Sequence, residues 1–166
     1  MDANQVIAAL DIPPGYSLKP VGRCHAEELA NTLRDADREE LRKLYGIEPR
    51  QAILDSVESS YWCLAFFDPA GKLICIGGVS GKPEDGLGLP WLLATNRIEA
   101  NRWAFLSISR QLVAQMRAEF KCLWNGVDIE NRAAIRWLGW LGFMFDPVPV
   151  TTAAGGTAQV FIMEDA

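Results

Sequence analysis

Residues 122–143 read Cys-Leu-Trp-Asn-Gly-Val-Asp-Ile-Glu-Asn-Arg-Ala-Ala-Ile-Arg-Trp-Leu-Gly-Trp-Leu-Gly-Phe, and they hold most of the architectural information in the sequence. The first part, 122–127, is a short apolar run typical of a buried strand. Asn131 is a favourable helix N-cap, and Gly142 can adopt the left-handed backbone conformation that ends a helix. The stretch therefore predicts a strand, a tight turn and a helix over 131–141.

Strand and helix patterns alternate through the rest of the chain. Apolar runs of strand length occur at 16–21, 61–67, 73–79, 89–95, 143–145 and 160–163. Apolar residues at helical spacing occur over 29–45, after Pro49 and over 101–119. Helices that alternate with strands in the second half predict a mixed sheet with a parallel pair and a right-handed crossover. We expect one α/β (α+β) domain over 1–166, with 1–15 as an N-terminal extension.

Two local patterns add detail to this prediction. Asp68-Pro-Ala-Gly71 is a favourable hairpin turn between two of the strands. Gly77-Gly78 lies inside a predicted strand, where glycine more often permits close packing than cradles a phosphate.

Composition and charge exclude several classes of protein. Hydrophobic residues make up 49% of the 166 residues and charged residues 22%, as in an ordinary globular domain. The net charge of −5 predicts no nucleic-acid partner, because nucleic-acid binders present a basic face. Apolar runs are too short to span a bilayer, and the N-terminus lacks the pattern of a signal peptide. We expect a cytoplasmic protein with no membrane insertion.

The cysteines and the single histidine predict no metal site. The four cysteines have no C-x-x-C spacing, and only His25 could join them as a ligand.

The segment from Asp128 to Phe143 resembles the GNAT (N-acetyltransferase) superfamily. In that family a strand ends, an Asn opens a helix, an Ala follows three residues later, and the helix stops at Gly-Phe. Asn131, Ala134, Gly142 and Phe143 fit this pattern, and the order of elements agrees over about 16–163. The resemblance implies a mostly antiparallel central sheet with a splayed parallel pair, flanked by about four helices.

A narrower resemblance concerns proteins of short-tailed bacteriophages. It rests on the runs 88–95, 125–128 and 136–138, together with Phe105 and Ser109. Those phage proteins have a GNAT-like fold and are internal virion or virion-assembly proteins. The resemblance implies phage virion or assembly proteins as partners, in the cytoplasm of a bacterial host cell or packaged in the virion.

The phosphate-binding motif of GNAT enzymes is altered in this sequence. These enzymes carry Q/R-x-x-G-x-G/A before the long helix, where backbone N–H groups hold the pyrophosphate of acetyl-CoA. Here the turn over 96–104 has no glycine, and Arg102 takes a glycine position in one register. If CoA binds, the candidate residues are Thr95, Arg97, Arg102 and Asn131, with the arginines acting through their guanidinium groups. The alternative is that both arginines are solvated charges at a helix start.

The catalytic groups are also altered. GNAT enzymes often place a Tyr four residues before the Gly of Gly-Phe, as the acid that protonates the leaving thiolate. Leu138 occupies that position here and has no proton to donate. The carboxylates nearest to the 89–95 strand are Glu84 and Asp85 in the preceding loop, and they are the catalytic candidates. The alternative is that both are solvated loop charges. The sequence predicts that acetyl-CoA binds weakly or not at all.

Three hypotheses follow for the function. The first is a GNAT-fold bacteriophage protein that acts in virion assembly or as an internal virion component, with acetyltransferase activity lost or marginal. The second is an active acetyl-CoA-dependent N-acetyltransferase with an atypical phosphate loop and an amine substrate. The third is a small-ligand binding module that keeps the cleft between the splayed strands.

The helix over 131–141 also predicts a partner-binding face. Ala134, Leu138 and Leu141 share the side expected to pack on the sheet. Arg132, Arg136 and Trp140 fall on the opposite side, and Trp and Arg are enriched at interface hot spots. We expect this face to dock a partner. The alternatives are a Trp140 ring covered by the Arg136 side chain, or one packed under the final loop.

Overall fold

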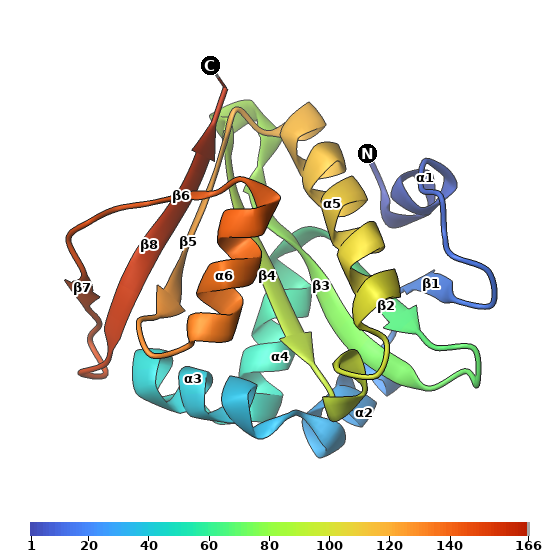
Figure 1. Cartoon of the computed structure of the whole chain (residues 1–166), viewed down its shortest axis with the longest axis horizontal. Coiled ribbons are helices and arrows are strands. Elements are labelled where there is room, and N and C mark those ends of the chain that lie inside the picture. The colour runs from blue at the N-terminus through green and yellow to red at the C-terminus, as the bar shows by residue number, and fades with distance from the viewer. Residues whose placement is uncertain (166) are drawn as a thin grey trace.

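An eight-stranded mixed sheet forms the centre of the molecule in the computed structural model, which describes residues 1–165 (Figure 1). The strand order is β1-β2-β3-β4-β5-β8-β6, and β7 pairs with β8. All pairings are antiparallel except the one between β4 and β5. The strands are β1 (Ser17–Pro20), β2 (Ser60–Phe67), β3 (Leu73–Lys82), β4 (Leu87–Ala94), β5 (Cys122–Asp128), β6 (Met144–Phe145), β7 (Val150–Thr151) and β8 (Thr157–Glu164).

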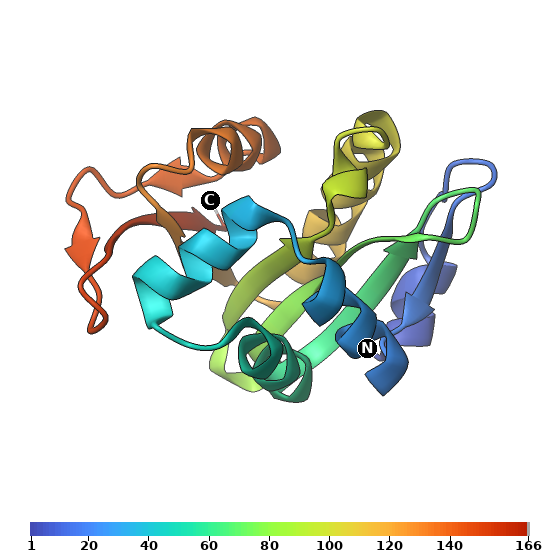
Figure 2. The same cartoon turned by 90° about the horizontal axis from the view of Figure 1, so that it is seen from below.

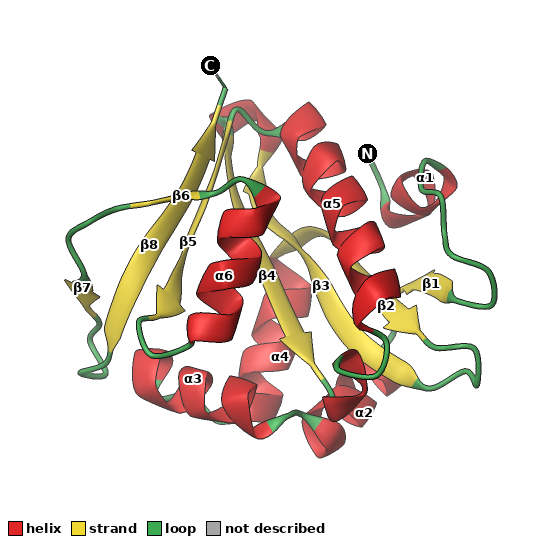
Figure 3. Ribbon diagram, in the orientation of Figure 1, coloured by secondary structure: helices red, strands yellow, loops and turns green. Residues whose placement is uncertain are grey.

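Helices cover both faces of this sheet (Figures 2 and 3). The α-helices of the described residues are α1 (Ala3–Ala8), α2 (Arg23–Thr32), α3 (Asp35–Tyr45), α4 (Pro49–Ser59), α5 (Arg102–Glu119) and α6 (Arg132–Leu141). Two 3₁₀ turns, η1 (Pro83–Asp85) and η2 (Asn96–Ile98), flank β4. One apolar core lies between the sheet and α1, α5 and α6, and a second lies under α2 and α4. None of the helices in residues 1–165 combines the length and the apolar character that crossing a membrane requires.

The helix count differs from the sequence-based expectation of about four. The segment predicted as one helix over 29–45 is two helices, because the chain is extended at Leu33 and Arg34. Leu33 forms an isolated antiparallel bridge with Thr95, and the Arg34 N–H donates to the Ala94 carbonyl at 2.9 Å. A tertiary backbone contact thus overrides the helical pattern. The extra helix α1 begins at an Asp2 capping box and buries Val6 completely.

The parallel pair β4–β5 opens into a V. Pairing covers only Leu87 with Cys122 and Gly88 with Leu123, after which the strands diverge. Gly88 is required at the closed end, since a Cβ there would lie 2.8 Å from the Phe120 ring. In the gap the Asn125 side-chain amide donates to the Pro90 carbonyl at 3.0 Å. Pro90 has no N–H to leave unpaired on this edge.

The expectation of close packing at Gly77-Gly78 is confirmed. A Cβ on Gly78 would lie 2.6 Å from the Cys63 Cα atom on β2. A Cβ on Gly77 would lie 3.0 Å from the Trp91 carbonyl oxygen on β4. Glycine here lets β3 lie tightly between its two neighbours.

We predict that Gly78→Ala destabilises the fold by about 1–3 kcal/mol, because the backbone of β2 must move to admit the methyl group. Urea denaturation measures the change in the free energy of unfolding. Gly139→Ala is the matched control: Gly139 lies within α6, where the added Cβ would meet the Phe145 ring at an ordinary 3.6 Å. That control should gain about 0.4–1 kcal/mol. Equal effects of the two substitutions would contradict the packing argument.

Candidate functional site

Helix α3 lies across the open end of the V between β4 and β5 (Figure 1). The Ala94 N–H, at the end of β4, donates to Asp37 Oδ2 at 2.7 Å. The Asp128 N–H, at the end of β5, donates to Glu40 Oε1 at 2.7 Å. Asp37 and Glu40 are three residues apart and so lie on one side of the helix. Two carboxylates of α3 therefore take the backbone donors of two strands that no longer pair with each other.

The Asp37 carboxylate is buried but has a cationic partner. Its side chain is 3% exposed, and Arg34 Nε lies 3.0 Å from Oδ2. Burial raises the pKa of Asp37, and the Arg34 guanidinium opposes that rise. Asp37 and Arg34 thus form a largely buried ion pair at the end of β4.

The Glu40 carboxylate has no cation within ion-pair distance among the described residues. Burial raises the pKa of Glu40, and the negative charges of Asp37 and Asp128 raise it further. Hydrogen bonds from the Asp128 N–H and the Asn131 side chain lower it in part. Burial raises the pKa of the Tyr45 phenol, and the negative charge of Glu40 raises it further. Glu40 thus differs from Asp37 in having no cationic partner within residues 1–165 to oppose the effect of burial.

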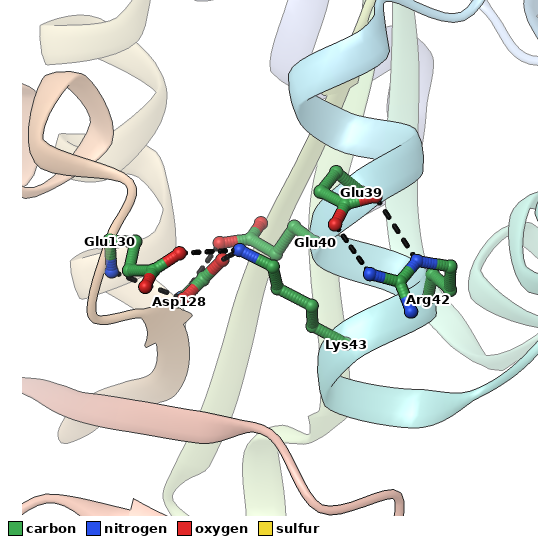
Figure 4. Close-up of polar contacts among 6 residues, drawn as sticks. All are labelled: Glu39, Glu40, Arg42, Lys43, Asp128 and Glu130. Carbon is green, nitrogen blue, oxygen red and sulfur yellow. Dashed lines mark hydrogen bonds and ion pairs between the residues drawn. The ribbon is translucent and has the colours of Figure 1, made fainter.

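Lys43 holds the turn after β5 against α3 (Figure 4). Its ammonium lies 2.6 Å from Glu130 Oε2 and 3.4 Å from Asp128 Oδ2. The Asp128 carboxylate also caps its own turn, accepting from the Glu130 N–H at 3.1 Å. Lys43 therefore neutralises part of the charge that faces Glu40 and fixes the Asp128 N–H that donates to it.

A cleft of about 760 Å³ lies in the V, and residues of the helices on both faces of the sheet line it. This volume suits a small-molecule ligand. On the α3–α4 side its lining includes Asp37, Glu40 and Asp55, with Tyr45. On the α5–α6 side its lining includes the following residues: Glu99, Arg102, Ser109, Arg136 and Trp137. The α3–α4 side thus carries three carboxylates against the guanidinium of Arg34, which also lines the cleft and pairs with Asp37. The α5–α6 side carries two guanidinium groups against one carboxylate.

Two of three comparisons with known proteins find nothing. No protein-family model matches the chain, and no curated protein does. Solved structures do resemble it. A ribosomal L7/L12 alpha-N-protein acetyltransferase in complex with coenzyme A superimposes with a TM-score of 0.66 at 8% identity, over 93% of this chain and 96% of that one.

Two further structures agree. A GCN5-related N-acetyltransferase from Kribbella flavida has a TM-score of 0.63 at 13% identity, over 92% of this chain and 99% of that one. Spermidine N-acetyltransferase from Vibrio cholerae, in complex with CoA and spermine, has a TM-score of 0.60 at 12% identity, over 92% and 96%. The chain has a GNAT fold. The predicted mostly antiparallel sheet with a splayed parallel pair is confirmed, and identities this low extend the likeness to fold alone.

The GNAT fold places the predicted phosphate-loop residues around the start of α5. Thr95 is buried; its hydroxyl donates to the carbonyls of Leu73 and Ile74 and accepts from the Arg97 N–H. Arg97 pairs with Asp68 at 3.4 Å. Arg102 is exposed, lines the cleft, and lies 5.3 Å from the Trp103 ring centroid. No side chain caps α5. Arg102 therefore differs from Arg97: it lines the cleft and forms no ion pair with a carboxylate of the described residues.

The remaining predicted site residues lie in different places. Asn131 lines the cleft and caps α6, accepting from the Ala134 N–H at 3.2 Å. Glu84 and Asp85 are exposed in η1, before β4, and are not among the residues that line the cleft. Leu138 is 6% exposed within the core. The GNAT fold therefore brings Asn131 to the same cleft as Arg102, and Glu84 and Asp85 to the opposite end of β4.

The predicted partner face of α6 is exposed, with one difference in detail. Arg132 and Arg136 are exposed and Trp140 is 43% exposed. The guanidinium that covers the Trp140 ring belongs to Arg110 of α5, at 3.9 Å from the ring centroid. The expected alternative of an Arg136 partner on the same helix is not what the structure shows.

Sequence reasoning missed Asp37, Glu40 and Lys43. They lie in the run Asp-Ala-Asp-Arg-Glu-Glu-Leu-Arg-Lys over 35–43, which has the ordinary appearance of a solvated helix face. The available signal was the spacing of Asp37, Glu40 and Leu41, which puts two carboxylates beside the buried stripe of the helix. Among the described residues, no group of three or more metal-binding side chains could hold an ion.

We predict that Glu40→Gln raises the melting temperature at neutral pH. A folded-state pKa above the unfolded value means that ionising Glu40 costs stability above the folded pKa, and that this cost disappears below the unfolded pKa of about 4.3. Gln keeps an acceptor for the Asp128 N–H and carries no charge. Calorimetry should therefore show a gain at neutral pH that vanishes in acid.

The control is Glu40→Ala, which leaves the Asp128 N–H without its acceptor and should cost about 1–3 kcal/mol. A melting temperature of Glu40→Gln below that of the wild type at neutral pH would show that the ionised form of Glu40 stabilises the fold.

Proposed function

We propose that this chain is an acetyl-CoA-dependent N-acetyltransferase of the GNAT type that acts on an amine. The observation that carries the proposal is the cleft through the V, with arginines on the α5–α6 side and carboxylates on the α3–α4 side. An anionic cofactor and a cationic acceptor thus have separate, oppositely charged approaches to one cavity. Two similar structures are complexes with CoA, and one of them also holds spermine, which supports the choice of an acyl-CoA and an amine as the ligands.

The cofactor side fits an acyl-CoA through side chains rather than through a glycine loop. Arg102 and Arg136 line the cleft and form no ion pair with a carboxylate of the described residues. Guanidinium groups bind phosphate oxygens through two parallel hydrogen bonds. Acetyl-CoA, when bound, supplies the thioester carbonyl carbon that an amine attacks.

Glu40 is the proposed general base. An acceptor amine enters from the acidic side as an ammonium ion and must lose a proton before its nitrogen can attack. The raised pKa of Glu40 brings its proton affinity closer to that of the acceptor than an ordinary carboxylate would have. The Asp128 N–H holds one carboxylate oxygen at 2.7 Å and fixes the group beside the cleft.

The leaving thiolate finds no acid at the position of Leu138, whose side chain is buried in the core. Solvent must supply that proton, so we expect slow turnover. The sequence also predicts weak acetyl-CoA binding, and the calorimetry described below measures that affinity.

We predict that Glu40→Gln lowers kcat for acetylation of a small polyamine by about 10²–10⁴-fold, since a positioned base contributes that much. Thiol release from acetyl-CoA measures the rate, and calorimetry should give an unchanged Kd for acetyl-CoA. The control Glu84→Gln alters an exposed carboxylate at the other end of β4 and should change neither quantity.

Arg102→Ala separates the two sides of the cleft. It should weaken acetyl-CoA binding by about tenfold or more, as the loss of a charge-assisted hydrogen bond does. The control is Arg117→Ala, which removes another arginine of α5, one that is paired with Asp165. It should leave acetyl-CoA binding unchanged. A wild-type protein that shows no heat of binding and no stabilisation by acetyl-CoA would contradict the proposal.

A second proposal, virion assembly or an internal virion role with catalysis lost or marginal, rests on the bacteriophage resemblance of the runs 88–95 and 125–128. It places the protein in a bacterial host cell or in the particle, with virion proteins as partners. Detection of this chain in purified phage particles supports it, and its absence from them contradicts it. A third proposal, a ligand-binding module, predicts stabilisation by a ligand without acetyl transfer.

A further inference from the structure

The arginines of this chain divide into two groups. Most of those outside the two helices α5 and α6 pair with carboxylates, as Arg34, Arg42, Arg50 and Arg97 do. On α5 and α6 only Arg117 has such a partner in residues 1–165. The arginines of these helices without one are Arg102, Arg110, Arg132 and Arg136.

Acidic residues are nearly absent from the same two helices. α6 has none, and α5 has only Glu119 at its last position, where it faces the N-terminal amine. A chain with a net charge of −5 thus leaves uncompensated positive charge on one face.

Two stripes on this face lie side by side. Trp103 and Arg110 are seven residues apart on α5, and Arg132, Arg136 and Trp140 follow at intervals of four on α6. The Arg110 guanidinium lies 3.9 Å from the Trp140 ring centroid and joins the stripes. We call these five residues the Arg/Trp surface.

The Arg/Trp surface is largely separate from the cleft. Among its members only Arg136 lines the cleft. Trp103 is 76% exposed and Trp140 is 43% exposed. Large exposed aromatic groups beside arginines have the composition of an interface hot spot, and neither Trp103 nor Trp140 lines the cleft.

The charge of the Arg/Trp surface identifies its occupant. Arginines without a carboxylate partner in residues 1–165 favour an anionic occupant, and the two exposed Trp rings favour one that also carries apolar side chains. We propose that the Arg/Trp surface docks an acidic segment of another protein, whose carboxylates meet the arginines and whose apolar side chains meet Trp103 and Trp140.

The test uses the full chain and a fluorescent peptide of alternating glutamate and leucine. Fluorescence anisotropy should show binding that weakens as salt rises. Trp140→Ala and Arg110→Ala should each weaken it by about tenfold or more. Arg117→Ala removes a paired arginine of the same helix and should leave it unchanged. None of these variants changes a residue that lines the cleft, so acetyl-CoA binding is a separate readout.

Several outcomes overturn the proposal. Equal affinity for a glutamine–leucine peptide would mean that carboxylates are not recognised, and no detectable binding would remove the docking role. Tighter binding of an oligothymidylate, or of vesicles containing anionic lipid, would assign the surface to another class of partner. If Arg117→Ala and Arg110→Ala lowered the affinity for the peptide equally, the binding would depend on net charge alone and not on the Arg/Trp surface.

Discussion

Two carboxylates one helical turn apart, Asp37 and Glu40, hold the ends of β4 and β5 open. Each accepts the last backbone donor of a strand whose neighbour has moved away, through hydrogen bonds of 2.7 Å. Without them two buried N–H groups would lack partners, at a cost of about 1–3 kcal/mol each. The V therefore does not depend on sheet pairing beyond its closed end at Gly88, and α3 replaces the missing strand contact along the open end.

The same arrangement gives the cleft its chemistry. Holding strands apart with carboxylates places negative charge on one side, and only Asp37 has a cation of its own. On the opposite side, the arginines belong to α5 and α6. These two helices contact each other through the Phe105 and Trp137 rings and through the hydrogen bond that the Trp137 indole N–H donates to the Ser109 hydroxyl. The carboxylates that hold the strands apart are thus the same residues that the proposed function assigns to the acceptor side of the cleft. Under that proposal, the stability lost by burying the ionised Glu40 accompanies its role as the base.

Local patterns predicted the parts of the structure that local physics determines. Asn131 caps α6 and Gly142 ends it with φ +102°, as the sequence around them indicates. The break at Leu33 and Arg34 was not predictable, because it depends on a pairing with Ala94 and Thr95 across the fold. Asp37 and Glu40 were missed for the same reason: their partners lie 57 and 88 residues away, and no periodicity marks such contacts. The absent glycine near Arg102 was visible in the sequence, whereas the charge separation of the cleft was not.

The account depends on Glu40 being a desolvated carboxylate without a cation of its own, facing Asp37 and Asp128. Titration of the Glu40 side-chain carboxyl by carbon-13 NMR measures this directly and needs no substrate. The account predicts a pKa above the ordinary glutamate value of about 4.3. A pKa at or below that value would show that Glu40 is solvated or paired, and would remove the reason for assigning it as the base.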